Sequence, residues 1–284
     1  MTSHAQSAPT ANATAPRLNL SKHLGNALFK GVCGLIFLFL LLPTVIVMPA
    51  SFSATQYLSF PPSQWSLRWY VAYFQDPEWI AATLFSLKVA GLTTVAAVVL
   101  GTMGALALMR GRMPLKGAMR AVVLAPMIVP HIVIAVAMYM VYMKWNLLGS
   151  LTGFVLAHTV VCVPFVVINV SAGLQKMDPS LEMAAASLGA NRLRAFRHVT
   201  LPLLGPSMAT SAAFAFITSL DEAVISYFLS SSTEKTLTRK MFEDIDFDLS
   251  PTIAVVSTLI IVVSVLLMGT IEGLRARAAR RAKV

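Results

Sequence analysis

Six long runs of apolar residues, separated by shorter polar segments, set the pattern of this chain. They cover about residues 27–50, 80–109, 121–143, 149–171, 203–229 and 251–271. A helix needs roughly 20 apolar residues to cross the hydrocarbon core of a bilayer, so each run is long enough for one crossing. The pattern predicts an all-α integral membrane protein with six transmembrane helices.

Proline residues interrupt two of these runs. Pro126 and Pro130 lie in the third run, and Pro164 lies in the fourth. A proline inside a transmembrane helix frees a backbone carbonyl, which neighbouring groups in a helix bundle can satisfy. We therefore expect kinks in these two spans.

The composition agrees with a membrane location. Hydrophobic residues make up 57% of the chain and charged residues 12%, and the mean hydropathy is +0.74. Soluble domains carry about 25% charged residues, so an ordinary soluble domain is excluded. Cys33 and Cys162 both lie in apolar runs and are expected to be free thiols.

The positive charge of the chain is distributed unevenly. The formal net charge is +10, and with the N-terminus in the cytoplasm sixteen Lys and Arg residues fall in inner segments against five in outer loops. Cytoplasmic loops carry an excess of Lys and Arg, so both termini and the segment 176–202 are predicted to be cytoplasmic. The basic surplus then reflects topology, and no nucleic-acid partner is expected.

These features divide the chain into four parts. Residues 1–24 are predicted to form a disordered cytoplasmic tail, and residues 25–79 the first transmembrane helix, retained as an anchor, with an outer loop. Residues 80–272 form the main transmembrane domain, and residues 273–284 a basic cytoplasmic tail. Because neither metal-ligand spacing nor a G-x-x-x-x-G-K-[ST] loop occurs in the sequence, no catalytic residue, metal site or cofactor is predicted for this chain.

One long polar segment, Lys176–Pro202, predicts two short helices. Asp178 or Ser180 can cap the first helix with a side-chain oxygen. Gly189 can adopt the left-handed conformation that ends it, and Asn191 can cap the second. Such a segment is either a docking element for a soluble protein or a basic loop held at anionic lipids.

The same segment resembles the coupling loop of ABC-importer permeases. The family pattern is E-A-A, with a glycine six residues after the glutamate, and then I-x-L-P. Aligned on Gly189, the corresponding residues are Met183, Ala184, Ala185, Val199, Leu201 and Pro202, and Glu182 directly precedes the glutamate position. The sequence thus departs from the pattern at Met183. The resemblance implies that these residues couple the membrane domain to an ATPase subunit.

The resemblance extends from about Ile80 to Ile271. Over this range the chain is similar to the membrane subunits of type I ABC importers, and most similar to the second permease of polyamine (spermidine/putrescine) systems. The segments that carry the likeness are ATLFSLKVAGLTTVAAVVLGT, VPHIVIAVAM, MDPSLEMAAASLGANRLRAFRHVTLPLL and FAFITSLDEAVISYFLSS. The family implies a bacterial inner-membrane location, a companion permease, two ATP-binding cassette subunits that bind the ATP, and an extracytoplasmic substrate-binding protein.

The function expected on this basis is that of a permease subunit. It would form half of the translocation pathway for a small cation such as putrescine or spermidine, and would itself do no covalent chemistry. An importer of another small solute (an opine, an aminophosphonate or ferric iron) is an alternative. A proton-coupled secondary transporter and a membrane scaffold are further alternatives, although neither explains the Ala-rich segment with its glycine turn.

Two adjacent carboxylates, Asp221 and Glu222, fall near the middle of the fifth run. A carboxylate at the bilayer centre costs about 2.5–3.5 kcal/mol, so it normally faces a bundle interior or a wet cavity. Adjacent helical residues diverge by about 100°, so only one of the two is expected to face a pathway directly. Phe216 and Tyr227 can add cation–π contacts. The alternative is a structural ion pair, for which Lys88 of the second run is the candidate partner.

Two other polar features have simpler interpretations. His131 follows Pro130 and is expected to be a hydrogen-bonded packing residue. Residues 231–250 carry several acidic and three basic residues. They form either a solvated face or a contact surface for an extracytoplasmic partner.

Overall fold

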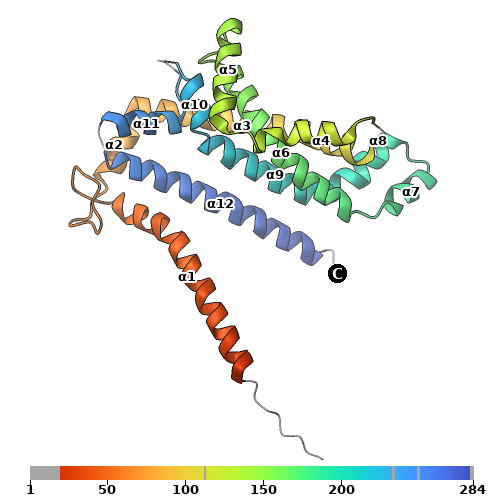
Figure 1. Cartoon of the computed structure of the whole chain (residues 1–284), viewed down its shortest axis with the longest axis horizontal. Coiled ribbons are helices and arrows are strands. Elements are labelled where there is room, and N and C mark those ends of the chain that lie inside the picture. Colours follow the sequence, from red (N-terminus) through yellow and green to blue (C-terminus); the bar gives the residue numbers. More distant parts are fainter. Residues whose placement is uncertain (1–19, 112, 232–233, 248–249, 282–284) are drawn as a thin grey trace, which may run out of the picture. The chain divides into compact units, whose positions relative to one another are not determined.

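The computed structural model describes residues 20–111, 113–231, 234–247 and 250–281 (Figure 1). Within these ranges, five helices are long and apolar enough to cross a membrane, and a bent pair makes up to six. The elements are α1 (Leu20–Ala50), α2 (Arg68–Gln75), α3 (Pro77–Arg110), α4 (Lys116–Leu124), η1 (Ala125–Met127), α5 (His131–Trp145), α6 (Leu151–Lys176), α7 (Ser180–Ser187), α8 (Arg192–Ala195), η2 (Phe196–Thr200), α9 (Leu201–Asp221), α10 (Val224–Leu229), α11 (Leu237–Phe247) and α12 (Thr252–Arg281). The helical fold class predicted from the apolar runs is confirmed.

The N-terminal unit, up to Ile46, consists of most of α1. Its apolar side chains are largely exposed; Phe39 retains 74% of its accessible surface. The predicted disordered tail at 1–24 falls mainly on residues 1–19, which lie outside the described part of the chain. The helix itself begins at Leu20, so the last five residues assigned to that tail are helical.

The second unit, from Val47 onward, is built around α3, α6 and α9, which pack against one another (Figure 1). Two glycines allow close helix contact. A Cβ atom at Gly101 would lie 2.5 Å from Cβ of Val166, and one at Gly173 would lie 2.5 Å from Oγ of Ser207. Small residues at helix interfaces let backbones approach within a membrane, where no hydrophobic force draws helices together.

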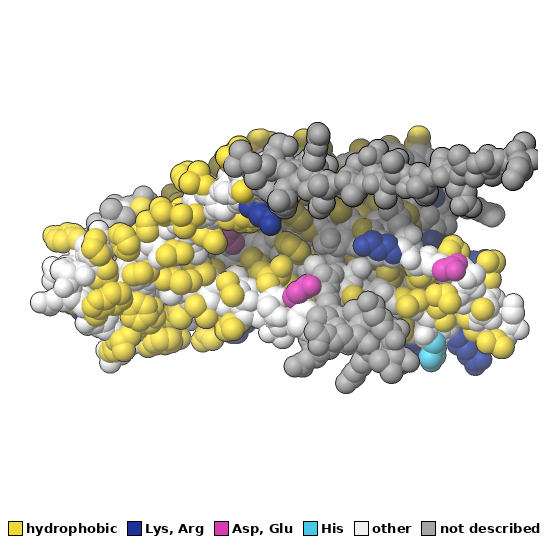
Figure 2. Space-filling view, turned by 90° about the horizontal axis from the view of Figure 1, so that it is seen from below, with side chains coloured by type: hydrophobic (Ala, Val, Ile, Leu, Met, Phe, Trp, Pro, Cys, Tyr) yellow, Lys and Arg dark blue, Asp and Glu magenta, His cyan; other side chains and the backbone are white. Residues whose placement is uncertain are grey.

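A smaller apolar cluster joins the start of α3 to α2, α11 and α12. Its buried members are Tyr73, Trp79, Leu237, Val255 and Val256. The predicted basic tail at 273–284 begins as a continuation of α12, which stays helical to Arg281. Figure 2 shows apolar side chains over much of one face of the molecule, with few charged groups among them, as expected for a surface in contact with lipid.

The third predicted span is a broken helix. The segments Lys116–Met127 and His131–Trp145 meet at an angle of 97°, so the interruption predicted from the prolines is a break in the helix. Pro130 has no N–H to donate, and its backbone adopts φ −55° and ψ 132° at the break. The two prolines do more than kink this span, and α5 extends away from the direction of α3, α6, α9 and α12 (Figure 1).

The fifth predicted span is broken as well. Helix α9 ends at Asp221, Glu222 has extended backbone angles, and α10 begins at Val224. The prediction of one helix over 203–229, with both carboxylates near its middle, is therefore wrong. The carboxylate of Glu222 explains the break, because it accepts a hydrogen bond from the backbone N–H of Ile225 at 3.0 Å and caps α10.

Candidate functional site

The coupling loop, defined here as Lys176–Pro202, consists of α7, a glycine turn, α8 and the single-turn π-helix η2 leading into α9. Two predicted caps are confirmed by hydrogen bonds. Oδ1 of Asp178 accepts from the N–H of Ser180 at 2.8 Å, and Oδ1 of Asn191 accepts from the N–H of Arg194 at 2.9 Å. The helices of this loop are thus fixed at their N-terminal ends by local side chains.

The turn between the two helices depends on Gly189. Its φ of +86° lies in the left-handed region that L-residues rarely adopt. The N–H of Gly189 donates to the carbonyl of Ala186 at 2.9 Å, and the N–H of Ala190 donates to the carbonyl of Ala185 at 3.0 Å. This pairing satisfies the last carbonyls of α7, as the sequence predicted for a glycine ending a helix.

Glu182 binds two other parts of the chain from its place in the first turn of α7. Its Oε1 accepts hydrogen bonds from the guanidinium of Arg110, the last residue of α3, and from the hydroxyl of the buried Thr200. Burial alone would raise the pKa of Glu182, but the two hydrogen bonds and the Arg110 charge outweigh it and lower the pKa below its ordinary value. We call these three residues the Glu182 clamp. It was not predicted from the sequence, because its members lie far apart in the chain.

Several apolar side chains of the coupling loop are exposed. Leu188 retains 89% of its surface, Leu193 73% and Met183 64%. Of the other predicted coupling residues, Ala184, Gly189 and Pro202 are exposed, whereas Ala185, Val199 and Leu201 are half-buried. A cavity of about 290 Å³ lies beside the turn, lined by residues that include Leu188, Gly189 and Val199. Exposed leucines next to a cavity on a polar loop form a surface suited to a protein partner.

The two adjacent carboxylates at the end of α9 have different surroundings. The Asp221 side chain is exposed, whereas that of Glu222 keeps only 4% of its surface. Oε2 of Glu222 lies 2.9 Å from Nδ1 of His131, the first residue of α5. The partner of Glu222 is therefore His131 and not Lys88, whose side chain is exposed on α3. His131 was expected to be a packing residue, but its side chain retains 43% of its surface, and its contact with Glu222 was not predicted.

The two aromatic residues expected to add cation–π contacts also have different surroundings. Phe216 is half-buried within α9, and Tyr227 retains 45% of its surface on α10. The guanidinium carbon of Arg239 lies 3.9 Å from the centroid of the Tyr227 ring, so one face of the ring already holds a cation. The ring of Phe228 contacts that of Tyr139 edge-on, with centroids 6.5 Å apart.

A fully buried histidine stabilises the same region. His158 of α6 hydrogen-bonds through Nδ1 to the hydroxyl of Ser219 at 2.8 Å and through Nε2 to that of Ser226 at 3.2 Å. The two serines lie on α9 and α10, so His158 bridges the break from the other side. Both ring nitrogens are satisfied, which leaves this residue a structural role.

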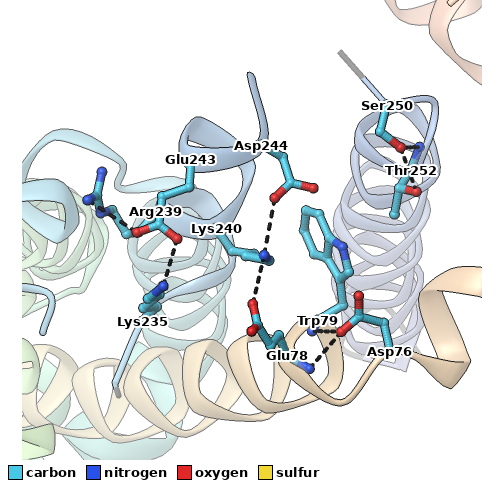
Figure 3. Close-up of polar contacts among 10 residues, drawn as sticks. All are labelled: Asp76, Glu78, Trp79, Lys235, Arg239, Lys240, Glu243, Asp244, Ser250 and Thr252. Atoms are coloured by element: carbon cyan, nitrogen blue, oxygen red, sulfur yellow. Dashed lines mark hydrogen bonds and ion pairs between the residues drawn. The ribbon is translucent and has the colours of Figure 1, made fainter. Parts of the chain in front are cut away.

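Helix α11 is held to the rest of this region by hydrogen bonds and ion pairs. The N–H of Leu237 donates to Oγ of Ser86 at 2.6 Å, and the hydroxyl of Thr238 donates to the carbonyl of Glu222 at 3.2 Å. The ammonium of Lys240 lies 2.9 Å from a carboxylate oxygen of Glu78 and 3.2 Å from one of Asp244 (Figure 3). A second set joins Glu243 to Lys235 and Arg239.

These ion pairs affect the ionisation of Lys240. Burial lowers the pKa of the Lys240 ammonium, but hydrogen bonds to Glu78 and Asp244 and the charges of both carboxylates outweigh it and raise the pKa above its ordinary value. Part of the charged segment at 231–250 is therefore engaged within the chain rather than simply solvated.

The fold is that of the membrane subunits of ABC importers. A bacterial ABC transporter involved in the import of the acidic polysaccharide alginate matches with a TM-score of 0.70 at 18% identity, covering 93% of this chain and 99% of that chain. The inward-facing MetNI methionine ABC transporter matches with a TM-score of 0.54 at 19% identity, covering 71% and 94%. At these identities the likeness establishes the fold.

The chain belongs to the family of binding-protein-dependent transport system inner membrane components, whose model matches residues 97–281. It is 29% identical over 232 residues to the putrescine transport system permease protein PotI of Escherichia coli K12, covering 79% of this chain and 82% of the relative. It is 28% identical over 234 residues to the spermidine/putrescine transport system permease protein PotC of Haemophilus influenzae, covering 82% and 90%. The chain is thus a multi-pass permease of the ABC-importer type, as predicted from its coupling loop.

Proposed function

We propose that this permease forms half of the translocation pathway of an ATP-driven importer for a small organic cation, of the putrescine and spermidine class. The other half would come from a companion permease, the energy from two ATP-binding cassette subunits, and the substrate from an extracytoplasmic binding protein. Both termini and the coupling loop would face the cytoplasm. The observation that carries the proposal is the coupling loop, with its glycine turn and exposed leucines, in a chain of this family.

The loop supports a mechanical role through its internal and external contacts. The Glu182 clamp holds α7 to the end of α3 and to η2, so the loop moves together with the membrane helices. The exposed side presents Leu188 and Leu193 to an ATPase subunit. ATP binding would draw the two coupling loops of the importer together, and the ATPase can shift the equilibrium only because it contacts the loop differently in the two states.

Asp221 is the carboxylate that we assign to the pathway. Its side chain is exposed, while that of Glu222 is occupied by His131 and by the cap of α10. An exposed carboxylate at the end of a transmembrane helix favours a cationic solute. This matters because a relative that is 31% identical over 190 residues, from Thermococcus kodakarensis, is named a molybdate/tungstate transport system permease protein. Family membership alone therefore does not fix the charge of the substrate.

The test is uptake by a reconstituted importer. The permease, its companion, the ATPase subunits and the binding protein would be placed in liposomes, and labelled putrescine uptake measured with and without ATP. We expect uptake that requires both ATP and the binding protein. Transport by this chain alone, driven by a proton gradient, would overturn the proposal.

A substitution tests the substrate class separately. We expect Asp221→Asn to reduce the maximal uptake rate of putrescine about tenfold, which corresponds to the loss of a charge contact worth ~1.4 kcal/mol. Asp221→Glu keeps the charge and should retain most of the uptake. Equal uptake in both variants would contradict the pathway role of Asp221 without affecting the importer assignment.

A further inference from the structure

A groove lies between α4 and the ends of α3 and α6; we call it the inner groove. It has a volume of about 410 Å³. Its lining residues are Leu108, Met109, Lys116, Gly117, Arg120, Leu124, Val167, Ile168, Ser171, Ala172 and Gln175. It is separate from the coupling loop, from the Glu182 clamp and from the carboxylates at the end of α9.

The polar part of the inner groove is basic. Lys116 and Arg120 are four residues apart on α4, so their side chains leave the same face of the helix. Both are exposed, and in the part of the chain that the structure describes neither forms an ion pair. Ser171 and Gln175, one turn apart on α6, add hydrogen-bonding groups. The described lining holds no carboxylate, so the site is built for an anion.

The rest of the inner groove is apolar. Leu108 and Leu124 contribute branched side chains from α3 and α4, and Val167 and Ile168 contribute theirs from α6. Ile168 retains 44% of its surface. A free inorganic anion gains nothing from such walls, whereas an acyl chain attached to an anionic group does.

The position of the groove fits the headgroup level of a membrane. Leu108 lies in the last turn of α3, and Gln175 is the penultimate residue of α6. Both helices have just passed through their apolar spans and end on the side of the coupling loop. Basic pockets between transmembrane helices at the cytoplasmic side bind the headgroups of anionic lipids.

We propose that the inner groove is a binding site for one anionic phospholipid. Its phosphate is held by Lys116 and Arg120, with Ser171 and Gln175 as further hydrogen-bond partners, and an acyl chain runs along Leu108, Val167 and Ile168. Because α4 is the inner arm of the span that bends by 97°, a lipid between α4 and the α3–α6 pair supports that bend. The proposal does not depend on which solute is transported.

The test is equilibrium binding of phosphatidylglycerol to the purified full chain in mild detergent, followed by native mass spectrometry. Each basic residue near an anionic lipid is worth about 1 kcal/mol, so Lys116→Gln/Arg120→Gln should bind roughly 30-fold more weakly. A matched double variant, Lys30→Gln/Lys144→Gln, removes the same charge elsewhere and should bind as the wild type does. Phosphatidylcholine should bind weakly to all three proteins.

A second variant tests the apolar part without changing charge. A Cβ atom at Gly117 would meet no atom within 4 Å, so the backbone there has room for a side chain, and Gly117→Leu adds an apolar one at the groove. We expect it to weaken phosphatidylglycerol binding while leaving the melting temperature unchanged. Displacement of the lipid by inorganic phosphate would overturn the proposal in favour of a free-anion site. Unchanged binding in the Lys116→Gln/Arg120→Gln variant would overturn it, as would crosslinking of residue 116 to a partner subunit instead of lipid in the assembled importer.

Discussion

The imidazole Nδ1 of His131 lies 2.9 Å from the carboxylate Oε2 of Glu222, and this contact joins the breaks of two different spans. His131 is the first residue of α5, after the bend at Pro130, and Glu222 separates α9 from α10. The segments on the far side of the two breaks, α5 and α10, pack against each other. The pair therefore holds two bent helices in one arrangement.

Removing this contact should destabilise the protein. In Glu222→Ala the cap of α10 and the partner of His131 are both lost, and the buried N–H of Ile225, left without its acceptor, costs about 1–3 kcal/mol. We expect a lower melting temperature of the purified chain in detergent, measured by tryptophan fluorescence. Asp221→Ala is the matched control, because its exposed side chain forms no such contacts, and it should melt as the wild type does. Equal melting of the two variants would exclude a structural role for Glu222.

The glycine turn of the coupling loop gives a second prediction. A valine at position 189 would have to adopt φ +86°, which costs L-residues roughly 1–2 kcal/mol. Gly189→Val should therefore rearrange the end of α7 and reduce copurification of the ATPase subunit and its stimulated ATP hydrolysis. Gly205→Val is the control: its site is equally open, but it lies within α9. Full ATPase stimulation in Gly189→Val would contradict a docking role for the turn.

The Glu182 clamp predicts a specific dependence on pH. The folded state lowers the pKa of Glu182 below its ordinary value of 4.5, so the clamp stabilises the protein above that value and is lost as the pH falls through the lower, folded pKa. Wild type should melt above Glu182→Gln at pH 7, by an amount equivalent to up to about 1 kcal/mol because the pair is partly exposed. The difference should vanish on acidification below pH 4.5. A difference that grows on acidification would refute the clamp.

Two glycines of α3 test the close contact with α6. A Cβ atom at Gly101 would approach Cβ of Val166 to 2.5 Å, whereas one at Gly104 would meet Cγ2 of Val167 at an ordinary 3.4 Å. We expect Gly101→Ala to destabilise the protein by about 1–3 kcal/mol, as overpacking usually does. Gly104→Ala should be nearly neutral. Thermal unfolding of both variants in the same detergent measures this difference. If Gly101→Ala melted as the wild type does, the contact between α3 and α6 would be easily loosened.

The sequence predicted the features that depend on neighbouring residues. The apolar runs gave the long helices, the caps at Asp178 and Asn191 followed from side-chain chemistry, and the turn at Gly189 followed from the freedom of glycine. Each of these features depends on residues that are close together in the sequence. The family resemblance likewise followed from short sequence segments, above all the coupling loop.

The features that the sequence did not predict depend on distant contacts. Arg110 and Glu182 are 72 residues apart, and nothing local to either residue indicates the other. No proline or glycine marks the break after Asp221 in the sequence. Instead, the carboxylate of Glu222 contacts His131 and accepts a hydrogen bond from the N–H of Ile225. The apolar runs therefore revealed the spans, and the prolines indicated where the third is interrupted, but nothing local indicated the break in the fifth.

The helix that begins in the coupling loop has a mechanical consequence. The stretch from Arg192 through η2 and α9 to Asp221 forms one span of 30 residues, about 45 Å long at 1.5 Å per residue. One end lies in the coupling loop, where the ATPase subunit would bind. The other end carries the exposed Asp221, next to the Glu222–His131 contact. A movement of the coupling-loop end would therefore be transmitted to Asp221 through one continuous helical segment, without crossing an interface between subunits. The proposed contact with the ATPase and the proposed cation-pathway residue would then lie at the two ends of the same helical span.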